Sequence, residues 1–465
     1  MSPLHLPPAM ADLRAELGAI VAGIEAKAPY GAALLSANQG LTIRVEDKEE
    51  TVTEIPPTAG TVLTAFDGLT VQENAISGFK NDEVRRGAQS LVDAIRFTPG
   101  NSSAPVDPGP IRQGDFASEN VAGLFSIQDT LERVRALHRR LRGRDQRLVN
   151  VRVRYAEFAE TSVFRNRTAD LAQEVIRQVM TLMIFASGSN GVRYNVFQKG
   201  TTKGWDELAF SDDELQGLID TTVALNDAER IDPGEYTIIT SPGVSGVLCH
   251  ESFGHGVETD MFLKERALAA HYLDRTIGSS LVNIFDDPSV SGAFGSYFFD
   301  AEGVLSKPTQ IVENGTFRRG ITDMYSAHAL NLQRTANGRR QDYSRKAYAR
   351  MSNTFFAPGT TPVSDLFAQV DNGVYLEQWS SGMEDPQGWG IQVTCHYGHE
   401  IKNGKVTGRM FAPIGISGYV PDVLQSVSAV GNDWALDPGG CGKGHKETIR
   451  VTSGGPHLLL KARLS

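Results

Sequence analysis

The chain has 465 residues, of which 40% are hydrophobic and 22% charged, an ordinary balance for a globular protein of about two domains. A net charge of −10 and a pI near 5.6 argue against a nucleic-acid-binding protein. No apolar run approaches the roughly 18 residues of a membrane-spanning helix, the N-terminus has no signal-peptide pattern, and three cysteines are too few for a disulfide framework. We therefore expect a soluble cytoplasmic protein with reduced thiols.

The N-terminal part begins with helical and strand patterns in alternation. Apolar residues at helical spacing predict helices over 11–27 and 78–97, and an alternating segment over 41–45 predicts a strand between them. The segment 99–110 is rich in Pro, Ser and Gly and predicts a loop. Ser126 is the expected N-cap of a third helix, whose apolar stripe continues to Leu141.

The third helix and its end are rich in arginine. The residues are Arg133, Arg135, Arg139, Arg140, Arg142, Arg144 and Arg147. Such a cluster can bind phosphate or face an acidic partner chain. It can also be the solvated side of an amphipathic helix, which the acidic total charge favours.

From Leu148 apolar residues recur at every second position, which predicts a strand. Further strands are predicted over 162–167, 171–185 and 191–200. We expect a twisted antiparallel sheet with helices on one side, that is, an α+β domain over residues 1–231. Near its end, Ser211-Asp-Asp-Glu214 predicts a capping box that opens a further helix.

The segment from His250 to His255 places two imidazoles and the Glu251 carboxylate within six residues. Two histidines can ligate Zn²⁺, and a neighbouring glutamate can accept a proton from a water that the metal activates. The familiar zinc-hydrolase pattern has its histidines at i and i+4 on one helix face. The motif alone is a weak signal, because a pair of histidines can also be structural.

Here the two histidines are five residues apart. On a regular α-helix, positions i and i+5 diverge by roughly 140°, so we expect a widened, π-type turn. Gly254 and Gly256 would ease it, since neither has a Cβ. A buried strand over 235–240, followed by Ser241 as N-cap and Pro242 at the first helical position, predicts that the motif ends a short helix.

The remainder of the second domain, 232–465, is expected to be β-rich, with an antiparallel sheet or barrel and few helices besides the short metal-binding one. Asn314-Gly315 and Asn403-Gly404 lie between strand-like segments and predict tight hairpin turns. Asn372-Gly373 follows a predicted helix over 362–370 and is expected to cap its C-terminal end.

A catalytic zinc site generally has three protein ligands and one open position. Cys441 is the favoured third ligand, because it lies in a Gly-rich, sterically open loop and Lys443 could lower the pKa of its thiol. His396 and His399 remain alternatives. Cys395 shares a strand face with apolar residues, and Cys249 also has the character of a small core residue.

Four stretches of the C-terminal half resemble the TldD/PmbA family, zinc metallopeptidases once described as modulators of DNA gyrase. They are the His-Glu-x-x-x-His segment with its following acidic residues over 250–260, Arg350-Met-Ser-Asn-Thr354, Gly431-Asn-Asp433 followed by Cys441-Gly-Lys443, and the segment from Gly303 to Gly315. The N-terminal half is compatible with the family and less diagnostic; Phe164-Arg-Asn-Arg167 is its best part.

The resemblance implies zinc held by His250, His255 and Cys441, with Glu251 as general base. It also implies a peptidase that acts on unfolded or flexible peptides inside a dimer, formed with itself or with a PmbA-like partner (TldE) that lacks the metal motif. This chain keeps the motif and would be the active subunit. The segment after Cys441 departs from the family pattern and leaves His445 without an assigned role.

Other polar residues are weaker candidates. Glu258 and Asp260 could orient a ligand imidazole. Arg350 could bind a substrate carboxylate or carbonyl, or form a structural salt bridge. Tyr325 and His328 are candidates for stabilising an oxyanion. Edge strands in the β-rich half could bind an extended peptide by strand addition.

Two other functions remain open. One is a zinc hydrolase that acts on a different bond, such as a small amide or a modified peptide during its maturation. The other is a partner-binding or regulatory protein in which zinc only ties the C-terminal domain together. A structural zinc generally has four protein ligands, so His399 or His445 as a fourth ligand would favour the second alternative.

Overall fold

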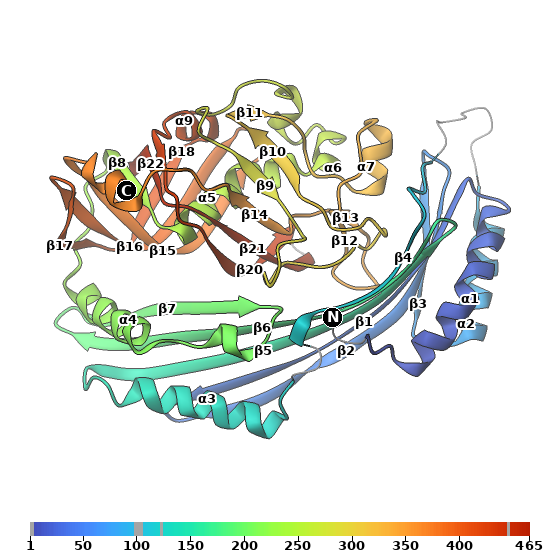
Figure 1. Cartoon of the computed structure of the whole chain (residues 1–465), viewed down its shortest axis with the longest axis horizontal. Coiled ribbons are helices and arrows are strands. Elements are labelled where there is room, and N and C mark those ends of the chain that lie inside the picture. The colour runs from blue at the N-terminus through green and yellow to red at the C-terminus, as the bar shows by residue number, and fades with distance from the viewer. Residues whose placement is uncertain (1–3, 97–105, 121–123, 444–446) are drawn as a thin grey trace.

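The computed structural model describes residues 4–96, 106–120, 124–443 and 447–465. Its first half forms a long, curved sheet that bends around the second half (Figure 1). The strands, in order across the sheet, are β3 (Val71–Ser77), β2 (Glu50–Phe66), β1 (Tyr30–Glu46), β5 (Leu148–Asn166), β6 (Ala169–Gly188) and β4 (Arg112–Ala117), with β7 (Gly191–Thr201) also paired to β6. Neighbouring strands are antiparallel except β4 and β6.

Four helices cover the outer face of this sheet. They are α1 (Pro8–Glu25), α2 (Asn81–Ala94), α3 (Ile127–Arg142) and α4 (Asp212–Ala224). Their apolar stripes pack on the outward-facing residues of β1, β2, β5 and β6 in two core clusters. This confirms the expected α+β arrangement with helices on one side of an antiparallel sheet.

The predicted caps of α3 and α4 are confirmed. The Ser126 side chain accepts a hydrogen bond from the Asp129 N–H, and Ser211 and Glu214 form the reciprocal capping box. The separate strand expected over 162–167 is wrong, because β5 runs unbroken to Asn166 in register with both neighbours. Of the loop predicted over 99–110, residues 99–105 lie outside the described residues.

The arginines of α3 and its end mostly pair with acidic residues of the same chain. Arg135 binds Glu50, and Arg142 binds Asp47, both near the β1–β2 turn. Asp212 at the start of α4 accepts from both Arg140 and Arg144. Each of these exposed pairs contributes at most about 1 kcal/mol to the stability of the fold. Their main effect is to balance charge on the outer face.

The second half contains a closed barrel and a second sheet (Figure 1). The barrel strands, in order, are β8 (Gly234–Thr240), β22 (Leu458–Leu464), β18 (Ile414–Tyr419), β16 (Gly390–Lys402) and β15 (Asn372–Asp385). The ring closes because β15 pairs with both β16 and β8. The expected β-rich domain with a barrel is therefore confirmed. The strands β17 (Lys405–Phe411) and β19 (Ala429–Val430) extend this ladder.

The second sheet lies beside the barrel. Its strands, in order, are β11 (Thr316–Phe317), β10 (Thr309–Glu313), β9 (Ile284–Asp286), β14 (Asn353–Phe356), β21 (Glu447–Gly455) and β20 (Ala435–Lys443). The smaller elements of this half are α6 (Thr259–Phe262), α7 (Met324–Ala329), α8 (Val363–Ala368), α9 (Val420–Gln425) and the β12 (Gly338–Arg339) and β13 (Tyr348–Ala349) pair. Helix α5 (Pro242–Phe253) packs between the barrel and this sheet in one shared core.

Two of the three Asn-Gly predictions are confirmed. Asn314 and Asn403 have φ values of 47° and 48°, and they turn the β10–β11 and β16–β17 hairpins. The predicted helix cap at Asn372 is wrong, because α8 already ends at Ala368 and Asn372 is the first residue of β15. A side chain at Gly373 would collide with the Thr237 carbonyl oxygen, so this glycine permits close strand packing.

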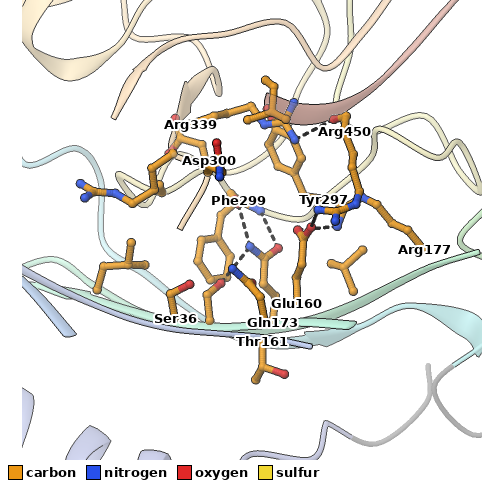
Figure 2. Close-up of a pocket in the computed structure, with 18 of the residues that line it drawn as sticks. Ser36, Glu160, Thr161, Gln173, Arg177, Tyr297, Phe299, Asp300, Arg339 and Arg450 are labelled. Carbon is orange, nitrogen blue, oxygen red and sulfur yellow. Dashed lines mark hydrogen bonds and ion pairs between the residues drawn. The ribbon is translucent and has the colours of Figure 1, made fainter. Parts of the chain in front are cut away.

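We propose a domain boundary near residue 231, because the last helical turn of the first half ends at Asp227 and barrel strand β8 begins at Gly234. Buried side chains of β6 hold the second half against the inner face of the sheet. Arg177 donates to the carbonyls of Phe294 and Ser296 at 2.8 and 2.7 Å. It also pairs with Glu160 (Figure 2). Among the described residues, no helix is long and apolar enough to cross a membrane.

Helix α5 approaches strand β21 more closely than a side chain allows. A Cβ on Gly246 would collide with the backbone of Gly454 and Ser453. By contrast, a Cβ on Gly217, which is exposed in α4, would meet nothing within 4 Å. The two helical glycines therefore provide a matched pair for testing this contact.

We expect Gly246→Ala to lower the free energy of unfolding by about 1–3 kcal/mol, because the helix must move off the sheet. Gly217→Ala should raise it by about 0.5–1 kcal/mol, because alanine favours the helix. Denaturant unfolding of both variants measures this difference. Equal effects at the two positions would contradict the close contact.

A buried carboxyl group at the base of α7 provides a second test. Glu302 accepts hydrogen bonds from the Met324 N–H and from Arg334. Burial, together with the nearby Asp323 and Asp300 carboxylates, raises the pKa of Glu302 to about 8, although Arg334 opposes the shift. The folded protein thus binds the Glu302 proton more tightly than the unfolded chain does. The bound proton therefore stabilises the folded state, and this stabilisation is lost as the pH rises from about 4.5 to about 8.

We expect the free energy of unfolding to fall between pH 5 and pH 8 by an amount on the order of a few kcal/mol, since one pKa unit corresponds to about 1.4 kcal/mol. Glu302→Gln keeps a neutral acceptor and should flatten this dependence. Glu54→Gln, at an exposed position of β2, should leave it unchanged. Denaturant unfolding at both pH values measures the slopes, and an unaltered slope in the Glu302 variant would refute the assignment.

Candidate metal centre

The two motif histidines lie on either side of a break in the helix. Helix α5 ends at Phe253, where the Gly254 N–H still donates to the His250 carbonyl in the α-helical pattern. A 3₁₀ turn then begins at His255. The predicted π-type turn is therefore wrong. A Cβ on Gly254 would collide with the Met351 sulfur and the His250 carbonyl oxygen, so glycine is needed for close packing at the break.

Cys441 lies on a regular strand, and the open loop expected for it is wrong. It belongs to β20, is buried, and pairs with Ile449 of β21. The neighbouring glycines are part of the same ladder. The direction of the thiol is therefore fixed by the register of β20 on β21.

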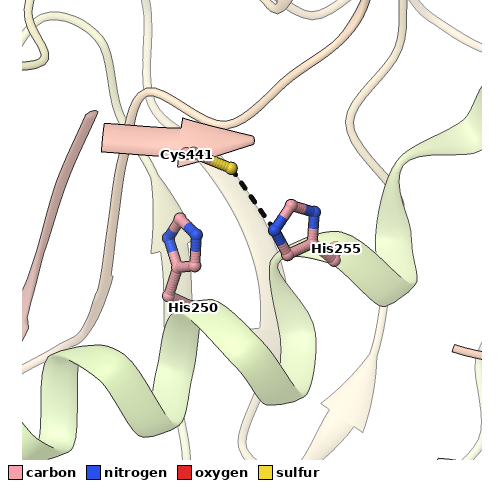
Figure 3. A group of neighbouring side chains, drawn as sticks. All are labelled: His250, His255 and Cys441. Atoms are coloured by element: carbon pink, nitrogen blue, oxygen red, sulfur yellow. Dashed lines mark hydrogen bonds between the residues drawn. The ribbon is translucent and has the colours of Figure 1, made fainter. Parts of the chain in front are cut away.

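The side chains of His250, His255 and Cys441 converge (Figure 3). One ligand atom from each lies within 4.8 Å of the others, and Cys441 Sγ is 3.3 Å from His255 Nε2. The imidazole rings are nearly perpendicular at a centroid distance of 5.2 Å. His250 Nδ1 is buried with no hydrogen-bond partner among the described residues. Buried polar atoms are nearly always paired, so this donor set fits a metal ion that accepts nitrogen and sulfur.

The electrostatics of this group favour a thiolate. Burial alone would raise the pKa of the Cys441 thiol, but the charges and hydrogen bonds of His250 and His255 hold it well below its usual value. In the opposite sense, burial would lower the pKa of His255, but Cys441 and Glu258 raise it well above the ordinary histidine value. Without metal, both shifts favour a thiolate beside an imidazolium.

A ring of buried charges surrounds the trio. Glu258 lies 3.5 Å from His255 Nδ1 and 3.0 Å from Lys443 Nζ. Its pKa falls to about 2, because the charges of Lys443, His255 and Arg350 outweigh the effect of burial. Lys443 also binds Asp260 at 2.6 Å. The lysine therefore neutralises two carboxylates instead of facing the thiol, and Glu258 is placed to orient the His255 ring.

Arg350 belongs to the same ring. Its side chain is 1% exposed, and it donates to the Cys441 carbonyl at 2.8 Å and lies 3.5 Å from Cys441 Sγ. It also pairs with Glu258 at 3.5 Å. This position is buried behind the cysteine, which favours the structural role over contact with a substrate.

Two glutamates lie next to the trio. Glu251 is half-buried and packs against Gly382 of β15, where a Cβ would contact its side chain. Glu384, also on β15, lies against Gly256, and both of its carboxylate oxygens are buried without a hydrogen-bond partner among the described residues. Burial and the charges of Glu251 and Glu258 raise the pKa of Glu384 well above its usual value, although His255 opposes the shift.

Glu384 is not among the residues that the sequence indicates for the site. It lies on an ordinary strand more than 120 positions from the motif, in no local pattern that indicates chemistry. Only the barrel, which places β15 beside α5, brings it to the site.

The remaining candidates lie elsewhere. In α7, Tyr325 and His328 contact Phe66 of the N-terminal sheet. His396 bonds to the Tyr194 carbonyl, and His399 pairs with Glu377. As expected, Cys249 and Cys395 are core residues. His445 is outside the described residues.

Comparisons with known proteins agree on one family. The family model described as PmbA/TldA metallopeptidase C-terminal domain matches residues 233–463. A protein named metalloprotease from Methanothermobacter thermautotrophicus is 31% identical over 317 residues, which cover 68% of this chain and 69% of that protein. A metalloprotease of Synechocystis sp. is 25% identical over 467 residues, covering 97% and 98%. A zinc metalloprotease TldD homolog of Saccharolobus solfataricus is 31% identical over 229 residues, covering 49% and 51%.

Solved structures share the whole fold. A structure described as a putative modulator of DNA gyrase, from Bacteroides thetaiotaomicron, has a TM-score of 0.77 at 16% identity and covers 99% of this chain and 100% of its own. TldE from Thermococcus kodakarensis has a TM-score of 0.74 at 16% identity, covering 98% and 100%. Together the sequence matches and the shared fold show that this chain belongs to the TldD/PmbA family.

Proposed function

We propose that the chain is a zinc-dependent peptidase that hydrolyses unfolded or flexible peptides. The observation that carries this proposal is the convergence of His250, His255 and Cys441 beside Glu251. The name of the Saccharolobus relative, a zinc metalloprotease, supports the choice of metal and reaction.

Zinc suits this donor set, because two neutral imidazoles and one thiolate are ordinary zinc ligands in a tetrahedral site. When bound, zinc supplies a Lewis acid that polarises the scissile carbonyl and lowers the pKa of a water molecule toward about 7. Within the described residues, no fourth His, Cys, Asp or Glu joins the trio. Three protein ligands leave one position open, which favours a catalytic zinc over a structural one.

Glu251 is the general base of this proposal. It forms no hydrogen bond or ion pair with the described residues and is half-buried beside the trio. Its carboxylate accepts the proton from the attacking water and passes it to the leaving amine. Glu258 accepts from His255 Nδ1 and thereby leaves Nε2 free to face the metal.

Arg350 supports the third ligand. By donating to the Cys441 carbonyl it fixes the end of β20, and its charge stabilises the nearby thiolate. Its role is to position the cysteine.

Membership of the TldD/PmbA family supports a proposal for the substrate and for the partner subunit. We propose that an extended peptide binds along strand edges by main-chain hydrogen bonds, and that the chain works as a dimer with itself or with a TldE-like subunit. The likeness to TldE of Thermococcus kodakarensis supports the second arrangement. Three free, buried cysteines are compatible with a reducing, cytoplasmic location.

Variants of the trio and of the base test the proposal directly. We expect about one zinc per chain in the wild type, and loss of both zinc and casein hydrolysis in His255→Ala and Cys441→Ser. Glu251→Gln should retain zinc but lose about 10²–10⁴-fold in kcat, because the general base is removed. Zinc analysis and cleavage assays on each protein measure these outcomes.

His399→Ala and Cys395→Ser are matched controls, because these residues lie away from the trio, and both should keep zinc and activity. Retained hydrolysis in the Glu251 variant would remove it as the base. If Cys441→Ser retained zinc, another residue would be the third ligand.

Zinc binding should release protons. Without metal, the lowered pKa of Cys441 favours its thiolate and the raised pKa of His255 favours its imidazolium. Zinc must displace the His255 proton, so affinity should rise with pH through the neutral range, with about one proton or more released per zinc. Calorimetric titration in buffers of different ionisation enthalpy measures this number, and no release would contradict the imidazolium.

A further inference from the structure

The segment Arg350-Met-Ser-Asn-Thr354 leads from the metal centre into strand β14. Its first residue, Arg350, donates to the Cys441 carbonyl at 2.8 Å and lies 3.5 Å from Cys441 Sγ. The proposed function assigns no role to the rest of the segment. The groups that hold this segment in place therefore determine where the Arg350 side chain lies relative to Cys441.

A buried carboxylate, Asp286 of β9, is the centre of the hydrogen bonds that hold this segment. Its two oxygens accept four hydrogen bonds. The Ser352 N–H and hydroxyl donate at 2.8 and 2.6 Å, and the Thr354 hydroxyl donates at 2.7 Å. The fourth donor is the side-chain amide of Asn337, at 2.6 Å. All four of these residues are fully buried.

Asn337 connects this carboxylate to Arg350. Its side-chain amide also donates to the Arg350 carbonyl at 3.0 Å, and the Arg350 N–H donates to the Asn337 carbonyl at 2.9 Å. Both main-chain polar groups of Arg350 are thus bound to one residue, which Asp286 holds in turn. A further contact comes from Arg339, whose guanidinium donates to the Met351 carbonyl. The position of Arg350 therefore depends on contacts that begin at Asp286.

An ionised carboxylate suits this position, because each of the four contacts brings an N–H or O–H hydrogen to Asp286. A carboxylate offers about four acceptor sites and no donor. An asparagine would present its own NH₂ group to some of these donors. A buried donor that loses its acceptor is costly, so the segment would have to move to satisfy the groups left unpaired.

We propose that Asp286 is a positioning residue of the metal centre, which acts on the Cys441 ligand through Asn337 and Arg350. The inference rests on the proposed zinc site. Within the described residues, Asp286 forms no hydrogen bond with any of the three ligands. Its effect is to keep the Arg350 guanidinium against the Cys441 carbonyl and beside the thiolate. Replacing the outer partners of metal ligands generally changes metal affinity by about 10–100-fold.

Zinc affinity, measured by competition with a chelator, tests the inference. We expect Asp286→Asn to weaken zinc binding by about 10–100-fold. Thr354→Val keeps the shape of the side chain and removes one of the four donors. It should weaken zinc binding by a smaller factor, about two- to tenfold. The milder variant keeps the test decisive if Asp286→Asn does not fold.

Thr222→Val is the matched control for Thr354→Val. Thr222 in α4 is also fully buried and donates one short hydrogen bond, to the Leu218 carbonyl at 2.6 Å. Its helix lies on the outer face of the N-terminal sheet. Both valine variants should lose comparable thermal stability, but only Thr354→Val should lose zinc affinity. Wild-type affinity in both Asp286→Asn and Thr354→Val would overturn the inference and leave the zinc site intact.

Cobalt in place of zinc shows whether the effect reaches Cys441. A bond between Co²⁺ and a thiolate absorbs in the near ultraviolet, and the band depends on the geometry of that bond. At saturating Co²⁺ we expect Asp286→Asn and Thr354→Val to weaken or shift the band, and Thr222→Val to keep it. Weaker zinc binding with an unchanged thiolate band would overturn the inference, because the cysteine would then be placed as in the wild type.

The metal-free protein separates failure of this inference from failure of the proposed function. If the wild type binds neither zinc nor cobalt, the zinc proposal fails, and the pH dependence of Cys441 alkylation by iodoacetamide still decides the role of Asp286. The pKa of Cys441 is lowered by His250 and His255, so a displaced thiol should react with a midpoint at higher pH. A higher midpoint in Asp286→Asn and Thr354→Val, but not in Thr222→Val, supports the inference. The wild-type midpoint in all three variants overturns it.

Discussion

The metal centre depends on how closely helix α5 lies on strand β21. Gly246 and Gly454 meet backbone to backbone, which only two residues without side chains allow. Strand β21 in turn holds β20 in register, with Cys441 opposite Ile449. Helix α5 supplies His250, the 3₁₀ turn that follows it supplies His255, and the strand supplies the thiol. The contact between α5 and β21 therefore sets the distance between His255 and Cys441, which are 186 positions apart in the chain. A one-residue slip of β20 would turn the thiol to the opposite face.

The charges around the trio are arranged so that each buried group has an opposite neighbour. Glu258 faces His255, Lys443 and Arg350, and Lys443 also faces Asp260. Such a network is costly to desolvate, and removing one member leaves the others uncompensated. The network holds the His255 ring, through Glu258, and the end of β20, through Arg350, without a metal ion. Glu384, beside Gly256, is the exception, since neither of its carboxylate oxygens has a hydrogen-bond partner in the part of the chain that the structure describes.

The sequence was most informative where the structure is local. The Ser211 capping box and the hairpins at Asn314 and Asn403 depend on a few neighbouring residues, and their positions could be predicted. The π-type turn was wrong because the geometry at Gly254 is set by Met351, a residue far along the chain. Likewise, the glycines around Cys441 suggested a loop, whereas pairing with β21 makes them a strand. Glu384 carries no local signal, because barrel closure places its strand beside the metal trio.

The inner face of the sheet and strand β20 are held at a fixed separation. Gln198 on β7 donates to the Pro438 carbonyl at 2.8 Å, and Arg177 on β6 binds the backbone at Phe294 and Ser296. A cavity of about 700 Å³ lies between them. A sphere of this volume has a radius of only about 5.5 Å, whereas a folded domain of 100 residues has a radius of gyration of about 13 Å. A space of this size has room for a short extended segment of chain but not for a folded domain.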